Sequence, residues 1–368
     1  MDEIKSTYFH SQNVPFSLIG CSLVRKNVFS QVIFWIASIG LIFNALYTIY
    51  FTISPVIHVH GASIGEYEEI LYQVFCLCLG LITMRFEINR SSYIKYMDFY
   101  QTIVANNFGK ASPKFVKKWG RNIRLWVAFA FIYETITSST NTYMYFQKFI
   151  LPVNMFATIA IGLIAQLSYI LSIQFMIECC IYCQSTFIPI NALLDTLLNQ
   201  NKHSSPIAFR RMARSTRVYY IKTIKSIGYM DRFLAYAIFV FYFQFIGHCI
   251  FIFSSTFANG QSLFMLCYSV FRFFGEGSYL VLVTYHLIRV NQLSVQIFDK
   301  VYQLSFSFNS DQSIEAINEI NLFLLRINRN DVGFTFADLC LVSPSFASSL
   351  VTISVTLGLA LPSIIKSH

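Results

Sequence analysis

Long apolar runs without a charged residue constrain this chain more than any other feature. Neither Val28–Phe51 nor Leu339–Ile365 contains Lys, Arg, Asp or Glu. About 20 apolar residues suffice for a helix to cross the hydrocarbon core of a bilayer. Charged residues make up 12% of the chain, against about 25% in an average soluble protein. This composition excludes a soluble enzyme, a disordered protein and a fibrous protein, and it predicts an all-α membrane protein.

Seven stretches are long and apolar enough to be interpreted as membrane-spanning helices. The third contains Glu134, and the fourth contains Glu178, which we expect to reach the membrane interface. The fourth is also expected to continue through Phe187–Leu198, with a kink at Pro189. The predicted spans are Val28–Phe51, Ile70–Met84, Leu125–Tyr145, Phe149–Cys183, Phe233–Phe257, Ser262–Ile288 and Leu339–Ile365.

The basic residues determine the predicted orientation. Of the 27 Lys and Arg residues, only Lys148 and Lys366 fall on one side of the membrane, and Arg272 falls within a span. All the others precede the first span or lie in the links after spans two, four and six. Because basic residues accumulate in cytosolic loops, we predict a cytosolic N-terminus and an extracellular C-terminus. The net charge of +9 then indicates a solvated cytosolic face, which we prefer to nucleic-acid binding.

The cytosolic links are long and helical in pattern. After span six, apolar residues recur every three or four positions on both sides of a turn, at Val290, Leu293, Ile297, Val301 and Leu304 and at Ile314, Ile317, Ile320, Leu324 and Ile327. Such stripes predict amphipathic helices that pack together beneath the membrane or lie on the lipid surface. The predicted organisation is a cytosolic N-terminus (1–27), a six-helix bundle (28–288) with cytosolic extensions (about 86–124 and 184–232), cytosolic anchor helices (289–332), and a seventh helix with a short external tail (333–368).

The C-terminal part of the chain has a characteristic layout. A long sixth helix enters the cytosol, a second helix returns, and Gly333-Phe334-Thr335-Phe336-Ala337-Asp338 leads into the last span. This layout and the inverted topology resemble the insect gustatory and odorant receptor superfamily of seven-transmembrane ion channels. The signature of that family is Thr-Tyr, five apolar residues and Gln-Phe. Thr352 matches its Thr, whereas Ile353, Leu359 and Ala360 replace the other three positions, which favours a divergent, gustatory-receptor-like member.

The resemblance implies a function as well as a fold. Members of this superfamily are homo- or heterotetrameric, ligand-gated, nonselective cation channels in which four copies of the last helix line the pore. The implied role is a chemosensory receptor subunit in the plasma membrane of sensory neurons. Its partners would be lipid, same-family subunits and a small-molecule ligand bound in the outer half of each helix bundle, and no cofactor is implied.

The last span offers a candidate pore face. Thr352, Val355, Thr356 and Leu359 recur at spacings of three and four, so they share one side of a helix. Threonine hydroxyls would contact water, and a ring of Leu359 side chains could close the pore by dewetting. The alternative is ordinary packing between helices, for which the many small residues of this span are equally suited.

Ionisable and hydroxyl residues inside the predicted spans mark a candidate ligand site. Arg272 and Glu276 lie four apart on span six, so they could pair with each other or form one wall of a pocket. The outer half of span three is rich in hydroxyls, which we expect to face a cavity rather than lipid. Together with aromatic residues at the same depth, the candidate ligand-binding residues are Tyr72, Phe75, Tyr133, Glu134, Thr137, Thr140, Asn141, Phe251, Phe264, Tyr268, Arg272 and Glu276.

Signals for catalysis or metal binding are weak. Cys180 and Cys183 form a C-x-x-C pair, but no second pair or suitably spaced His completes a zinc site, so we predict no metal. The chain contains no phosphate-binding loop and no hydrolase or metalloprotease motif, so we predict that it is not an enzyme. Two alternatives stay open: a metabotropic seven-helix receptor, which would require the opposite orientation, and a small-solute transporter.

Overall fold

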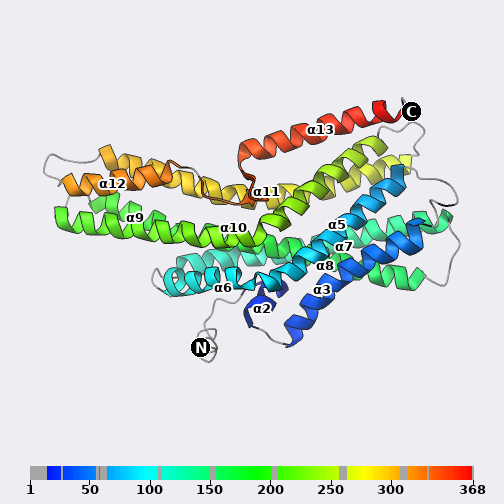
Figure 1. Cartoon of the computed structure of the whole chain (residues 1–368), viewed down its shortest axis with the longest axis horizontal. Helices are drawn as coiled ribbons and strands as arrows, with labels where there is room; N and C mark the ends of the chain where they lie inside the picture. The colour runs from blue at the N-terminus through cyan, green and yellow to red at the C-terminus, as the bar shows by residue number, and fades with distance from the viewer. Residues whose placement is uncertain are drawn as a thin grey trace.

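The computed structural model of the chain is an assembly of long helices (Figure 1). It describes residues 15–25, 28–54, 58, 64–106, 110–148, 155–200, 205–256, 263–306, 314–329 and 331–366. The α-helices are α2 (Leu18–Arg25), α3 (Val28–Tyr47), α5 (Ile64–Ile88), α6 (Arg90–Phe99), α7 (Ala111–Lys148), α8 (Met155–Ser185), α9 (Phe187–Gln200), α10 (Pro206–Thr256), α11 (Leu263–Phe306), α12 (Ile314–Ile327) and α13 (Pro344–Lys366). Two π-helical segments, η1 (Thr48–Ile53) and η2 (Tyr100–Ala105), extend α3 and α6.

Five helical stretches within the described part of the chain are long and apolar enough to cross a membrane. They are Gln31–Phe51, Glu69–Ile88, Ile159–Asn199 (which continues from α8 into α9), Ile207–Gly247 and Leu266–Phe306. The third predicted span lies in α7, which is not among these five, and the seventh lies in α13, whose apolar stretch is the shorter Pro344–Leu357. The all-helical, multi-pass character is therefore confirmed, while the count of seven spans stays a prediction.

Helices α10 and α11 run nearly the whole length of the molecule (Figure 1). At one end they lie beside α9 and α12, and at the other they lie among α3, α5, α7 and α8. The predicted stripe of α11 is largely buried, as are Ile320 and Ile327 of α12, whereas Ile314 at the start of α12 is exposed. Arg217 of α10 forms an ion pair with Glu319 of α12 at 2.9 Å. The two amphipathic helices after span six therefore pack against the other helices through the predicted faces.

The break between α8 and α9 shows the influence of Pro189 on the chain upstream of it. The helix is interrupted at Thr186, three residues before the proline. Because Pro189 has no N–H, it cannot donate to the carbonyl of Ser185. That carbonyl instead accepts a hydrogen bond of 2.9 Å from the hydroxyl of Ser112 on α7. The predicted kink is therefore present, but it lies before the proline and is stabilised by a neighbouring helix.

The carboxylate of Glu178 on α8 is buried, with 0% of the residue exposed. It accepts hydrogen bonds from the backbone N–H of Phe16, from the N–H of Ser17 at 3.1 Å and from the Ser17 hydroxyl. Glu178 is therefore enclosed by the segment that leads into α2, and its depth relative to the membrane interface stays a prediction. This carboxylate attaches the N-terminal segment to the centre of the bundle.

A short hairpin connects α12 to α13. Strands β1 (Thr335–Phe336) and β2 (Cys340–Leu341) pair antiparallel, with Thr335 opposite Leu341 and Phe336 opposite Cys340. Gly333 has φ +153°, and a Cβ there would lie 2.9 Å from Leu341, so a side chain at this position would be strained and crowded.

Helix α13 begins later than the predicted span, which started at Leu339. Residues Cys340 and Leu341 belong to β2, and the N–H of Val342 donates to the carbonyl of Phe334. The hydroxyl of Ser343 accepts from the N–H of Phe346 at 3.3 Å, and Pro344 occupies the first helical position. This is an ordinary N-cap followed by proline, so the start of the predicted span was wrong by five residues.

Asp231 of α10 attaches this hairpin to the bundle. Its carboxylate accepts the N–H of Thr335 at 2.7 Å and the hydroxyl of the same residue at 3.0 and 3.1 Å. The first strand of the hairpin is therefore held against α10 just before the chain enters α13.

Replacement of Asp231 tests this attachment. We expect Asp231→Ala to lower the free energy of unfolding by about 1–3 kcal/mol, because it removes the acceptor of the Thr335 N–H and leaves the Thr335 hydroxyl only a long contact of 3.4 Å to Asp338. Asp231→Asn retains one acceptor oxygen and should recover most of this loss. Thermal unfolding of the purified protein measures the change. The control is Asp195→Ala, which removes an exposed ion pair with Lys300 and should cost at most about 1 kcal/mol; equal effects of the two alanine variants would contradict the assignment.

Candidate ligand site between α5, α7, α8 and α11

Helices α7 and α11 are joined by two tyrosines from the predicted site. The hydroxyl of Tyr133 on α7 donates to the carbonyl of Arg272 on α11 at 3.2 Å. The hydroxyl of Tyr268 on α11 donates to the carbonyl of Thr137 on α7 at 3.1 Å. The guanidinium of Arg272 lies 5.9 Å from the centre of the Tyr268 ring. Four predicted site residues are therefore brought together in one contact between two helices.

Gly275 makes the close approach of these helices at Tyr133 sterically allowed. A Cβ at this position would lie 2.1 to 2.4 Å from the Cζ, Cε2 and hydroxyl oxygen of Tyr133. Non-bonded heavy atoms normally lie about 3.5 Å or more apart. The ring of Tyr133 therefore occupies the space that any side chain at position 275 would need.

Aromatic rings continue the site from α11 to α8 and α5. Tyr133 packs on Tyr279 with ring centres 6.1 Å apart, Tyr279 on Tyr169 at 5.8 Å, and Tyr169 on Phe75 at 6.0 Å. Tyr169 and Tyr279 were not predicted. Tyr279 could have been found, because it lies seven residues after Arg272 and three after Glu276, on the same face of the helix. Tyr169 is one of 22 tyrosines, and no pattern distinguishes it.

Carboxylates lie beside these rings. Glu134 of α7 is 6% exposed and Tyr279 of α11 is 2% exposed. The hydroxyl of Tyr279 lies close enough to the carboxylate of Glu134 to interact with it. Glu276 of α11 lies close enough to interact electrostatically with Tyr72, Tyr133, Tyr169 and Tyr279. We call these residues the Glu134 cluster: Tyr72, Phe75, Tyr133, Glu134, Thr137, Tyr169, Tyr268, Arg272, Glu276 and Tyr279.

Several predicted site residues do not join this cluster. Phe264 lies in the first turn of α11 and is 60% exposed. Thr140 donates its hydroxyl to the carbonyl of Ile136 in its own helix at 2.9 Å. The side chains of Asn141 and Phe251 lie outside the described residues.

The hydroxyl-rich stretch of α7 does not need a cavity to satisfy its polar groups. Thr135 donates to the carbonyl of Phe131, and Thr137 donates to the carbonyl of Glu134. Threonines commonly bond back to their own helix in this way. These threonine hydroxyls therefore do not by themselves require a cavity, and a cavity along this stretch stays a prediction.

Helix α13 packs on α10 through one face and leaves another face exposed. Leu350 and Ser354 are buried, and the ring of Phe346 lies 5.3 Å from that of Tyr242 on α10. Of the candidate pore residues, Thr352 and Thr356 are exposed, whereas Val355 is half-buried and lines the apolar space between α13 and α11. The side chain of Leu359 lies outside the described residues. The two exposed threonines are therefore available to a channel lumen or to a neighbouring molecule.

Comparison with solved structures finds this architecture in an insect receptor. The insect olfactory receptor OR5 from Machilis hrabei, in complex with eugenol, matches with a TM-score of 0.68 over 99% of this chain and 97% of the receptor, at 12% identity. The chain has the fold of an insect olfactory receptor. A second structure of OR5 matches with a TM-score of 0.57 over 92% and 89% of the two chains, also at 12% identity.

The fold of OR5 confirms, at the level of architecture, the predicted resemblance to the insect gustatory and odorant receptor superfamily. No model of a protein family matches the chain, and no curated protein matches it. The likeness is therefore one of structure over essentially the whole length, with little similarity of sequence. Both of these solved structures are of a receptor.

Proposed function

We propose that this chain is a chemosensory receptor subunit that forms a ligand-gated, nonselective cation channel. The observation that carries the proposal is the end-to-end match to an olfactory receptor in complex with eugenol. The departures from the superfamily signature at Ile353, Leu359 and Ala360 favour a gustatory-type member over an odorant-type one. The sites of action would be the plasma membranes of sensory neurons.

The Glu134 cluster is the proposed ligand site. It combines aromatic walls with a few polar groups, which is the composition of pockets for small organic molecules. The buried carboxylate of Glu134 and the hydroxyl of Tyr279 beside it could bind a hydrogen-bonding ligand.

The proposed topology is seven spans with a cytosolic N-terminus, and the proposed assembly is a tetramer with α13 at its centre. Epitope tags at each terminus, stained in intact and in permeabilised cells, test the orientation. Staining of an N-terminal tag in intact cells would contradict it and favour a metabotropic receptor. Particle imaging of the purified chain tests the assembly: fourfold particles are expected, and particles without fourfold symmetry would contradict a homotetramer.

The pore assignment of α13 predicts a gain of function. If Leu359 forms a closing apolar ring, then Leu359→Thr should raise the basal conductance in the absence of ligand, because a polar ring no longer expels water. Current in oocytes that express each variant measures the effect. The control is Leu357→Thr, because residues two apart in a helix point about 200° away from each other. Unchanged basal current in a channel that still responds to ligand would remove Leu359 from the gate.

A further inference from the structure

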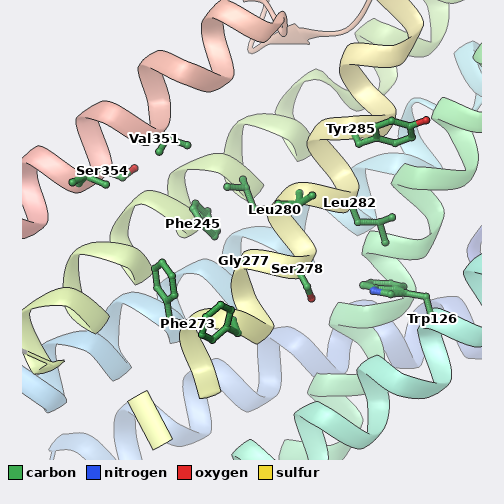
Figure 2. A pocket seen from close by; sticks show the side chains of 13 residues that line it. Trp126, Phe245, Phe273, Gly277, Ser278, Leu280, Leu282, Tyr285, Val351 and Ser354 are labelled. Atoms are coloured by element: carbon green, nitrogen blue, oxygen red, sulfur yellow. The ribbon is translucent and has the colours of Figure 1, made fainter. Parts of the chain in front are cut away.

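An apolar groove of about 700 Å³ lies between α11 and α13 (Figure 2). It adjoins the Glu134 cluster at Trp126, whose ring centre lies 5.2 Å from that of Tyr279. Helix α11 supplies most of its lining. The other three helices around it contribute Trp126 from α7, Phe245 from α10, and Val351, Ser354 and Val355 from α13. Phe274 and Val281 on the α11 side are 71% and 68% exposed. The groove is therefore open to the surroundings of the chain.

The two serine hydroxyls that line the groove are already satisfied. Ser278 donates to the carbonyl of Gly275 at 2.6 Å, and Ser354 donates to the carbonyl of Leu350 at 2.8 Å. Both bonds stay within the serine's own helix, so neither hydroxyl needs a partner in the groove. An apolar groove whose serine hydroxyls are satisfied favours a hydrocarbon occupant over water.

The length of the groove matches one leaflet of a membrane. It extends along α11 from Phe273 to Tyr285, which is roughly 18 Å at the helical rise of about 1.5 Å per residue. The hydrocarbon core of a bilayer is about 30 Å thick. With the orientation proposed above, the Tyr285 end of the groove lies toward the cytosol, so the groove spans the inner leaflet.

A basic residue continues the groove at this inner end. Phe274, Ser278, Val281, Tyr285 and Arg289 recur at spacings of four, three, four and four, so they form one stripe along α11. Arg289 takes part in none of the ion pairs found among the described residues, and its one recorded side-chain hydrogen bond is a long one of 3.4 Å to Gln292. A guanidinium at the end of an apolar groove is suited to a phosphate group.

We propose that this groove binds an anionic phospholipid of the inner leaflet, with an acyl chain between α11 and α13 and its phosphate at Arg289. The lipid would fill the space that separates α13 from α11. Because α13 also packs on α10, the bound acyl chain supports the helix from the side of α11. Lipid composition would then alter the position of α13, and with it any pore that α13 lines.

Quenching of Trp126 fluorescence by brominated lipid tests this site directly. The chain has three tryptophans, so replacing Trp35 and Trp119 by Phe leaves Trp126 as the reporter. The full chain is reconstituted in phosphatidylcholine vesicles with a minor fraction of phosphatidylserine, and bromine is placed on the acyl chains of one lipid or the other. At equal bromine content we expect brominated phosphatidylserine to reach half-maximal quenching at about a fivefold lower fraction than brominated phosphatidylcholine.

Two substitutions distinguish the contribution of the lipid headgroup to binding from that of the acyl chain. Arg289→Gln should abolish the preference for phosphatidylserine, whereas its control Arg214→Gln, an exposed arginine of α10, should retain it. A Cβ at Gly277 meets no atom within 4 Å, so Gly277→Leu should fill the groove and reduce quenching by both lipids. Gly228→Leu is the matched control, because a Cβ at Gly228 also meets no atom within 4 Å and the residue does not line the groove.

Two results would overturn the proposal. Equal quenching by both lipids in the parent chain would show that Trp126 meets only bulk lipid. No quenching by either lipid would show that protein, such as a second copy of the chain, covers the groove. Native mass spectrometry of the chain with all three tryptophans provides a second measurement: co-purified phosphatidylserine should be lost in Arg289→Gln and retained in Arg214→Gln.

Discussion

Removing the carboxylate of Glu178 should lower the free energy of unfolding by about 2–4 kcal/mol, because three donors of Phe16 and Ser17 would lose their only charged acceptor in a buried site. The carboxylate is fully buried and receives the two N–H groups and the Ser17 hydroxyl. We therefore expect Glu178→Ala to release the segment that leads into α2. Thermal unfolding measures the loss, and limited proteolysis shows whether the chain before α3 becomes cleavable.

Two variants keep the Glu178 experiment interpretable. Glu178→Gln retains one acceptor oxygen and nearly the same volume, so it should lie between the parent and Glu178→Ala. Glu87→Ala removes a half-exposed carboxylate that lies 3.7 Å from Arg90, and it should cost at most about 1 kcal/mol. If Glu178→Ala is as stable as Glu87→Ala, the buried carboxylate does not hold the N-terminal segment.

Gly275→Ala should both destabilise the protein and disrupt the proposed ligand site. The new methyl group would overlap the ring of Tyr133, and overpacking of this kind costs about 1–3 kcal/mol. Displacement of the ring would also break the hydrogen bond from Tyr133 to the Arg272 carbonyl, worth about 1 kcal/mol. Ligand sensitivity in current recordings should fall together with the melting temperature.

Replacing another helical glycine, Gly228, should have the opposite effect on stability. Gly228 is also helical, but a Cβ there meets no atom within 4 Å, so Gly228→Ala should raise stability by about 1 kcal/mol through helix propensity alone. Combining Gly275→Ala with Tyr133→Ala tests whether a steric clash causes the destabilisation, because Tyr133→Ala removes the ring that the new methyl group would overlap. A double variant that is less stable than Tyr133→Ala alone would contradict a clash between these two residues.

Local patterns in the sequence were sufficient for the helices but not for their partners. The stripes at Val290–Leu304 and Ile314–Ile327 predicted two amphipathic helices, and both are present. The start of α13 was also readable, because Ser343 followed by Pro344 is a helix-start signal, but the apolar run obscured it. Such features depend on residues that are neighbours in the chain.

Long-range contacts could not be predicted in the same way. Glu178 lies near the end of a predicted span, where a charged residue is expected to reach the membrane interface. Its burial follows from partners about 160 residues away in sequence. The Glu134 cluster was predicted only in part. Arg272 and Glu276 were noticed because they are charged residues within a predicted span, and Tyr133 because it precedes Glu134. Tyr169 is recognised only from its contact with Tyr279 in the structure. Local patterns in a single sequence do not reveal which of the 38 Phe and 22 Tyr residues contact one another.

Recording from excised membrane patches that contain this chain tests the proposed function most directly. A ligand-gated channel should carry a cation current when ligand is applied, and the current should persist in patches free of nucleotides and soluble cytosolic proteins. Glu134→Ala should reduce the ligand sensitivity of that current while leaving the unitary conductance unchanged. A response that disappears on excision and returns only with GTP, or solute flux without unitary currents, would contradict the proposal that the chain forms a ligand-gated channel.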